Sequence, residues 1–206
     1  MFNLTKARSI ADAVVAQLRN HCEVINIAGS IRREKMEVKD IEIVCVPKTM
    51  KIGGKDLFGE DTRKTIVSPE FVRVVSGLGR IIKGKTDGRM MQILLPENIQ
   101  LDLFMPQPID YWRQFVIRTG SADYSKNVIA TAWVKNGWVG TDDGLRLRTE
   151  CEGAEQKMFD KLGAPYVKMK WACIAKEPTL PPVWESEREF LQWLGVTLLH
   201  PKYRVV

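Results

Sequence analysis

Hydrophobic residues near the start of the chain recur every three to four positions. The residues of segment 4–20 that fall largely on one side of a helix are Leu4, Ile10, Val14, Val15 and Leu18. The charged residues of this segment fall elsewhere, as they do in an amphipathic helix packed on a core. The pattern therefore predicts a helix here, with Asn3 or Thr5 as its N-cap.

Two short apolar runs follow this helix, at residues 24–28 and 41–46. The first run ends in Gly29-Ser30, and the second is rich in β-branched residues and is closed by Pro47. Such runs, bounded by turn residues, are typical of strands. They predict two strands joined by a loop and a short helix.

The middle of the chain alternates between polar and apolar segments. Residues 48–64 are rich in Lys, Gly and Asp and predict a surface loop, and residues 71–75 predict a short helix before Gly77. Three apolar segments then follow with turn residues between them, at residues 80–83, 89–95 and 99–105. Their spacing predicts an antiparallel meander.

Pro106 and Pro108 interrupt the pattern and predict a boundary between residues 1–107 and 108–206. Beyond them the periodicity predicts helices at residues 111–119, 126–135, 152–162 and 187–194, and a hairpin at residues 138–148. The expected fold class is α+β. The first part is a mixed or antiparallel sheet flanked by helices, and the second part is a small α+β subdomain.

Composition narrows the class of protein. The chain has 206 residues, of which 45% are hydrophobic and 27% charged, so it can bury a core and is not intrinsically disordered or collagen-like. Its longest apolar runs fall far short of the roughly 20 residues of a membrane helix, and its start lacks the pattern of a secretory signal. An intracellular protein without a membrane partner is expected.

The net charge and the cysteines say less about the class of protein than the hydrophobic content does. The net charge is 31 − 25 = +6, which favours polyanionic partners but is also common in proteins that bind none. The four cysteines, Cys22, Cys45, Cys151 and Cys173, are scattered without a Cys-x-x-Cys motif. The sequence therefore predicts neither a zinc site nor a disulfide framework, and the cysteines are expected to be small buried residues.

Three acidic residues lie inside apolar strand segments. Asp40 and Glu42 are separated by one residue, so strand alternation places both carboxylates on one face. Asp102 lies in a later strand, also between apolar residues. Neighbouring carboxylates repel each other and are costly to bury, so a hard divalent cation is a natural partner if the two strands are adjacent.

The turn before these acids has the residues of a phosphate site. Gly29-Ser30 offers backbone N–H groups and a hydroxyl, and Arg33 adds a charged fork. Each feature has an ordinary alternative: a solvated strand face, a common turn, or surface charge. Together with Asp40, Glu42 and Asp102 they favour nucleotidyl transfer, in which two metal ions assist an in-line displacement on a triphosphate.

These motifs resemble the palm of the family X (polymerase beta-like) DNA polymerases. The resemblance begins with Gly29-Ser30-x-Arg32-Arg33, Asp40-x-Glu42 and Asp102. It continues with Lys83-Gly84-Lys85-Thr86, Thr119-Gly120-Ser121, Lys126-Asn127, Asn136-Gly137-Trp138 and the segment from Ser186 to Arg204. It leaves residues 48–70 and about 150–183 unmatched, and is closest to the reduced viral form that has only a palm and a thumb.

The resemblance implies a role for each matching residue. Asp40, Glu42 and Asp102 would hold two Mg²⁺ ions, with Mn²⁺ as an alternative metal, and Asp102 would activate the primer 3′-hydroxyl. The nucleotide would be bound by Gly29, Ser30, Arg33, Gly120, Ser121 and Ser125, and the DNA by Lys83, Lys85, Thr86 and Lys126. Residues 1–107 would be the palm and 108–206 a thumb-like part, without an amino-terminal lyase domain.

The chain departs from the family pattern at several positions. Glu42 stands where the family has Asp, Ile117-Arg118 replaces an aromatic pair, and Ser125 and Ile129 stand where members have Asn and Arg. The longer acid changes the geometry available to Mg²⁺, which tolerates such changes poorly. The other departures put sugar discrimination and fidelity in question.

The function that the resemblance implies is template-directed DNA synthesis, with short-gap filling in repair by a monomer. Its partners would be a primer-template or gapped DNA and a deoxynucleoside triphosphate. Two alternatives remain open at this point. One is a nucleotidyltransferase with a non-DNA acceptor, and the other is a DNA-binding remnant whose site is weak or dead, for which Glu42 is the motivating residue.

Overall fold

The computed structural model describes residues 1–55, 61–159 and 163–205, and its fold is mixed α and β, as predicted. The described chain divides into two compact units. Unit 1 comprises Met1–Ser125 and Leu199–Val206, and unit 2 comprises Lys126–Leu198. Each unit has its own sheet.

A mixed five-stranded sheet forms the centre of unit 1. Its strands, in spatial order, are β2 (Cys22–Ile27), β4 (Asp40–Pro47), β9 (Gln100–Phe104), β8 (Met90–Leu94) and β7 (Arg80–Gly84). β4 and β9 are parallel, and the other neighbours are antiparallel. The predicted meander is therefore confirmed as β7, β8 and β9.

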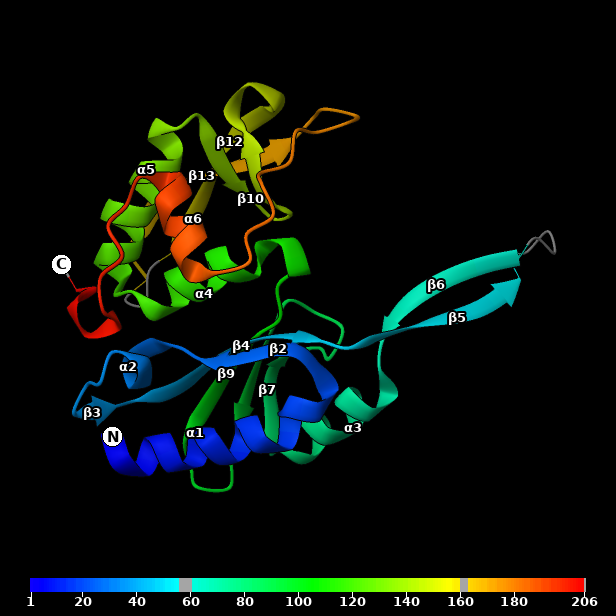
Figure 1. Ribbon diagram of the computed structural model, residues 1–206, viewed down its shortest axis with the longest axis vertical. Coiled ribbons are helices and arrows are strands. Elements are labelled where there is room, and N and C mark those ends of the chain that lie inside the picture. Colours follow the sequence, from blue (N-terminus) through cyan, green and yellow to red (C-terminus); the bar gives the residue numbers. More distant parts are fainter. Residues whose placement is uncertain (56–60, 160–162, 206) are drawn as a thin grey trace. The chain divides into compact units, whose positions relative to one another are not determined.

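Two helices cover one face of this sheet (Figure 1). They are α1 (Leu4–Leu18), whose first turn is capped by the Asn3 side chain, and α3 (Pro69–Gly77), capped by Ser68. Alternate residues of β4, such as Ile41 and Ile43, are fully buried against them. Burial of such side chains, at roughly 25 cal/mol per Å² of apolar surface, stabilises this layer.

A smaller apolar cluster lies on the opposite face of the sheet. It joins Val44, Val46 and Phe104 of the strands to Tyr111 and Phe115 of α4 (Tyr111–Thr119), which follows the short helix η2 (Pro108–Asp110). Because α4 packs on β4, it belongs to unit 1. The contacts therefore divide the chain after Ser125, whereas the prolines predict a boundary at residue 107.

Short elements complete unit 1. They are β1 (Phe2–Asn3), paired with β3 (Glu37–Val38), and the helices α2 (Gly29–Arg32), η1 (Arg19–His21) and η5 (Pro201–Tyr203). The predicted arrangement of strand, short helix and strand is confirmed as β2, α2 and β4. The segment between β2 and β4, which contains α2 and β3, thus leads into the strand that carries Asp40 and Glu42.

The segment predicted to be a surface loop is a two-stranded arm. β5 (Thr49–Lys55) and β6 (Asp61–Val67) pair with each other in a separate antiparallel sheet that extends away from the central sheet of unit 1 (Figure 1). Residues 56–60 lie outside the described residues. The polar composition correctly predicted that this segment is exposed. It did not predict the strands, because few side chains of the arm are buried and the segment therefore lacks the apolar pattern by which strands are recognised.

The described residues of unit 2 form a four-stranded sheet and several helical segments. The strands, in spatial order, are β11 (Gly144–Leu147), β10 (Trp138–Thr141), β13 (Pro165–Cys173) and β12 (Cys151–Phe159). The helical segments are η3 (Tyr124–Ala130), a π-helical turn that begins in unit 1, then α5 (Thr131–Lys135), η4 (Arg148–Glu150) and α6 (Glu187–Leu194). The hairpin predicted at residues 138–148 is confirmed as β10 and β11.

The helix predicted at residues 152–162 is wrong. Residues 151–159 form β12, which pairs antiparallel with β13 along its whole length, and residues 160–162 lie outside the described residues. The segment is rich in Ala, Glu, Gln, Lys and Met, which favour helices. Backbone pairing with the following strand, β13, outweighs this weak local preference. Among the described residues, no helix is long and apolar enough to cross a membrane.

Candidate functional site

The three predicted acids lie on two neighbouring parallel strands of unit 1. Glu42 of β4 is directly opposite Asp102 of β9, and Asp40 is opposite Gln100. All three acids share the sheet face that also carries Val44, away from α1 and α3. The adjacency of the two strands, which the sequence left open, therefore places the acids on one side of the sheet.

The side chains of these acids do not form a ready metal cage. Within the described residues, no three His, Cys, Asp or Glu side chains are grouped so that they could hold a metal ion as they stand. Oδ1 of Asp102 accepts hydrogen bonds from the amides of Gln92 (3.2 Å) and Gln100 (2.7 Å). Binding a metal ion with all three acids therefore requires their side chains to reorient.

Burial and mutual repulsion act on the two β4 acids. Burial, and then the charge of Asp40, raise the pKa of Glu42 to about 7, although Arg118 and Arg33 oppose the shift. Burial, and then Asp102, raise the pKa of Asp40. A cation would relieve this repulsion, and three carboxylates are ligands that Mg²⁺ prefers. The donor set therefore fits a divalent metal.

The Gly29 turn lies against the end of Glu42. Gly29 has φ of 62°, and a Cβ built at this position would collide with the Glu42 carboxylate. The Ala28 N–H donates to the Glu42 carbonyl at 2.8 Å, which ties the turn to β4. Only glycine combines this backbone conformation with so close an approach. Glu42 thus reaches the turn that the resemblance assigns to the triphosphate.

Ser30 presents an unsatisfied hydroxyl in this turn. Its Oγ is buried and has no hydrogen-bond partner among the described residues. A buried hydroxyl without a partner costs about 1–3 kcal/mol, which a bound polar ligand would recover. This feature is compatible with a ligand at the turn, and the phosphate site expected from Gly29-Ser30 stays a prediction.

The Arg33 side chain donates hydrogen bonds to backbone carbonyls at the end of α4. One terminal nitrogen, Nη1, donates to the carbonyls of Thr119 (2.6 Å) and Gly120 (3.0 Å). Burial lowers the pKa of Arg33, opposed by the charges of Glu42 and Asp40. Arg33 therefore joins the turn to the end of α4, and its Nε is buried without a partner in the described part of the chain.

The predicted residues 120, 121 and 125 form one tight turn after α4. A Cβ on Gly120 would lie 2.7 Å from the Tyr124 ring and 2.9 Å from the Ser125 Oγ. The Ser121 Oγ accepts from the Tyr124 N–H at 3.0 Å, and the Ser125 Oγ donates to the Ile117 carbonyl at 2.7 Å. The turn therefore contacts Arg33 through the Gly120 carbonyl, whereas the Ser125 hydroxyl is used in a hydrogen bond to the backbone of α4.

Arg118 is a site residue that the sequence analysis noted only as a departure from the family. Its guanidinium lies 3.9 Å from the centre of the Phe104 ring, and its charge opposes the raised pKa of Glu42. Burial lowers the pKa of Arg118, and its Nε has no partner among the described residues. Arg118 thus adds a second cation beside the acids.

Gln92 and Gln100 were missed as well. Gln100 lies two residues before Asp102, so strand alternation could have placed it on the same face. Gln92 could not be placed in this way, because its position opposite Asp102 depends on how β8 and β9 pair. Both amides hold the Asp102 carboxylate, as described above.

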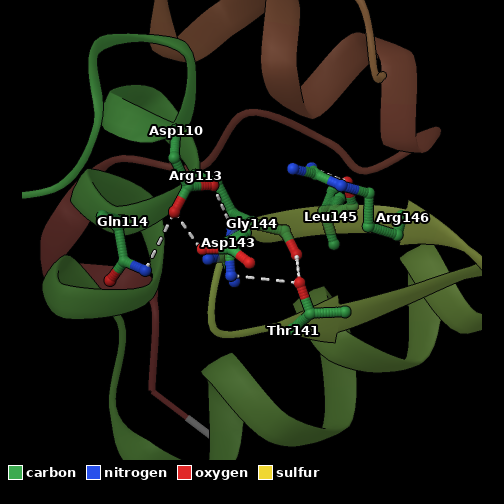
Figure 2. A network of polar contacts seen from close by, with 8 residues as sticks. All are labelled: Asp110, Arg113, Gln114, Thr141, Asp143, Gly144, Leu145 and Arg146. Atoms are coloured by element: carbon green, nitrogen blue, oxygen red, sulfur yellow. Dashed lines mark hydrogen bonds and ion pairs between the residues drawn. The ribbon is translucent and has the colours of Figure 1, made fainter. Parts of the chain in front are cut away.

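A buried ion pair fixes the start of α4. Arg113 donates from Nε and Nη2 to the two carboxylate oxygens of Asp110, at 2.5 and 2.6 Å, and Gln114 donates to Asp110 Oδ2 at 3.1 Å (Figure 2). In unit 2, the Thr141 hydroxyl donates to the Gly144 carbonyl at 3.0 Å and closes the β10–β11 turn (Figure 2). Both networks are structural.

Lys83 lies in register with the acids. Glu42 is opposite Asp102, Asp102 is opposite Gln92, and Gln92 is opposite Lys83, which follows a register shift in β7, so these residues form one row of paired positions across four strands. Neighbouring strands are about 4.8 Å apart, which puts Lys83 roughly 10 Å from Asp102 along this row. Lys85 is exposed and Thr86 half-buried in the following turn.

Lys126 begins unit 2, where its side chain is exposed. The motif residues Asn127 and Asn136 line a cavity of about 330 Å³ in this unit, together with Lys135, Leu194 and Gly195. Its lining mixes these polar side chains with apolar ones such as Val128 and Val196. Each unit thus contains part of the motif set that the resemblance covers.

Comparison with models of protein families gives no match to this chain, and comparison with curated proteins gives no significant match.

Proposed function

We propose that this protein is a nucleotidyltransferase of the family X DNA polymerase type. It transfers a deoxynucleoside monophosphate from a triphosphate to a primer 3′-hydroxyl, with pyrophosphate as the leaving group. The single observation that carries the proposal is the row of Glu42 and Asp102 on adjacent parallel strands, with Asp40 on the same face and the Gly29 turn beside it.

Each residue has a part in this reaction. Asp40, Glu42 and Asp102 would hold two Mg²⁺ ions. Bound Mg²⁺ would supply the positive charge that lowers the pKa of the primer hydroxyl and offsets the charge on the phosphates. The bond that forms joins the primer oxygen to the α-phosphorus, and the bond that breaks releases pyrophosphate. The Ser30 hydroxyl, which has no partner in the described structure, donates to a phosphate oxygen.

Positive charge at the acid row supports a nucleic-acid substrate. The exposed Lys83 stands at the end of that row, and Lys85 follows it in the β7–β8 turn. Lysines at this spacing bind the phosphates of a primer strand and hold its end beside Asp102. Such contacts are independent of base sequence, as template-directed synthesis requires.

Primer extension on DNA with a one-nucleotide gap tests the proposal. Each deoxynucleotide is supplied separately with Mg²⁺ and then with Mn²⁺, and incorporation is expected only opposite its complement. Asp102→Asn, which keeps the shape of the side chain, is expected to lower the rate at least about 100-fold because it removes a metal-binding charge. Glu97→Gln, at an exposed acid of the β8–β9 turn, is the control and should retain the wild-type rate.

Other results would favour the alternatives. Incorporation that ignores the template would point to a nucleotidyltransferase with another acceptor. Binding of gapped DNA without any incorporation would point to a DNA-binding remnant, the alternative motivated by Glu42 standing where the resembled family has Asp. Full activity in Asp102→Asn would contradict the assignment of the metal ligands.

A further inference from the structure

Two of the four cysteines face each other at the base of a hairpin in unit 2. β12 and β13 pair along their length (Figure 1), and Cys151, the first residue of β12, is directly opposite Cys173, the last residue of β13. The Ile174 N–H donates to the Glu150 carbonyl at 2.9 Å, so the backbone pairing continues beyond the cysteines. The two backbones are therefore held together on both sides of this pair.

The spacing of such a pair suits a disulfide. Directly opposed residues of an antiparallel ladder have Cα atoms about 4.5–5.5 Å apart and side chains on the same face. Disulfides span Cα separations of about 4.4–6.8 Å. Both cysteines are free thiols in this structure. Burial, and then the neighbouring Cys173, raise the pKa of the Cys151 thiol, as expected for two thiols in contact.

Exposure separates this pair from the other cysteines. Cys22 and Cys45 also interact with each other, across β2 and β4, but both are buried in the core of unit 1. Cys151 and Cys173 are half-buried and lie on a hairpin whose side chains are mostly exposed. A small-molecule oxidant can therefore reach them without opening a core.

We propose that Cys151 and Cys173 are a redox modification site, which forms a reversible disulfide by exchange with a small-molecule disulfide such as oxidised glutathione. One cysteine thiolate attacks this disulfide, forms a mixed disulfide and releases one small thiol. The second cysteine thiolate then attacks the protein-bound sulfur and releases the second small thiol. The two thiols of the protein lose two electrons and two protons, and the small disulfide gains them.

The disulfide locks the base of the β12–β13 hairpin. The disulfide closes a covalent loop that contains both strands, so β12 and β13 can no longer part from each other starting at the cysteine end. The oxidised form therefore has a more rigid hairpin, whereas the reduced form can open there. The site is independent of the acids and of the proposed transfer reaction.

The test uses the full chain under native conditions with excess oxidised glutathione. After denaturation, an alkylating reagent should label two cysteines instead of four, and peptide mapping should recover a cross-link between Cys151 and Cys173. Reduction should restore four labels. Hydrogen exchange at the amides of β12 and β13 should be about tenfold slower in the oxidised protein.

Single variants provide the control. Cys151→Ser and Cys173→Ser should each retain a glutathione adduct on the remaining cysteine and should show no slowing of exchange. Three results would overturn the proposal: four labelled cysteines after oxidation, a cross-link between Cys22 and Cys45 instead, or stable glutathione adducts on both hairpin cysteines of the wild-type chain.

Discussion

At the scale of the residue, the most unusual group is Glu42. It is longer than the aspartate of the resembled family, and its carboxylate lies against Gly29. Burial and Asp40 raise its pKa to about 7, and Arg118 and Arg33 only partly offset this shift. In the absence of a metal ion, ionised Glu42 is therefore unfavourable to the folded state.

The stability of the metal-free protein should accordingly depend on pH. An acid whose pKa is raised by folding stabilises the folded state below its unfolded pKa, near 4.5, and this contribution is lost as pH rises through about 7. We expect the free energy of unfolding to fall by on the order of 2–3 kcal/mol between pH 5 and pH 8. Urea unfolding at several pH values in the presence of a chelator measures this free energy.

Glu42→Gln is the matched variant for this measurement. It removes the titration, so most of the pH dependence should disappear, with a smaller part remaining from Asp40, whose pKa is also raised. An unchanged slope in this variant would show that other groups cause it. Asp12→Asn, at an exposed acid of α1 on the sheet face opposite the site, should keep the wild-type slope.

At the scale of the element, α2 and α4 are joined through arginines. Arg33 donates to the last carbonyls of α4, and Arg32 donates to the Thr119 hydroxyl at 2.7 Å. Cations at the carboxyl end of a helix also interact favourably with its dipole. The Gly29 turn is therefore positioned by α4, although residues 33 and 119 lie far apart in the sequence.

Arg33→Lys should loosen this connection. A lysine keeps the charge but cannot reach both carbonyls with the geometry of a guanidinium. We expect a loss of about 1–2 kcal/mol in the free energy of unfolding, because hydrogen bonds to a charged group are replaced by weaker contacts. Lys35→Gln, at an exposed position two residues away, should change it by less than about 0.5 kcal/mol. Equal stability of the two variants would contradict the role of Arg33.

At the scale of the whole molecule, the chain carries a net charge of +6. Lys83 nevertheless lies in the same row of paired positions as Glu42 and Asp102, so binding of a nucleic acid depends on where the charges lie and on the metal that would offset the acids. The proposed function places DNA phosphates at Lys83 and Lys85, which are both exposed. Electrostatic binding of this kind releases counterions and weakens with salt.

DNA affinity should therefore fall linearly with salt on logarithmic axes. Each phosphate contact contributes about 0.9 to the slope for duplex DNA, so the double variant Lys83→Gln, Lys85→Gln should lower the slope by about 2. Fluorescence anisotropy with a labelled gapped duplex at several salt concentrations measures the affinity and hence this slope. Arg73→Gln, at an exposed cation of α3 on the sheet face opposite the acids, is the control. Equal slopes for all three proteins would remove these lysines from the DNA site.

Patterns within short segments were sufficient to predict the α+β class, the first and last helices and the meander. They also placed Asp40 and Glu42 on one face, because side chains alternate along a strand with a period of two. The Gly29-Ser30 turn followed from the same local chemistry. Each of these predictions depends only on residues that are close in sequence.

Tertiary pairing decided the rest. The position of Asp102 opposite Glu42 depends on β9 lying parallel to β4, and the position of Cys173 opposite Cys151 depends on β13 pairing with β12. Local propensity instead predicted a helix where β12 lies, and the spacing of the cysteines gave no indication that Cys151 faces Cys173. Contacts between distant segments are selected by the energy of the whole fold, which no short window of sequence contains.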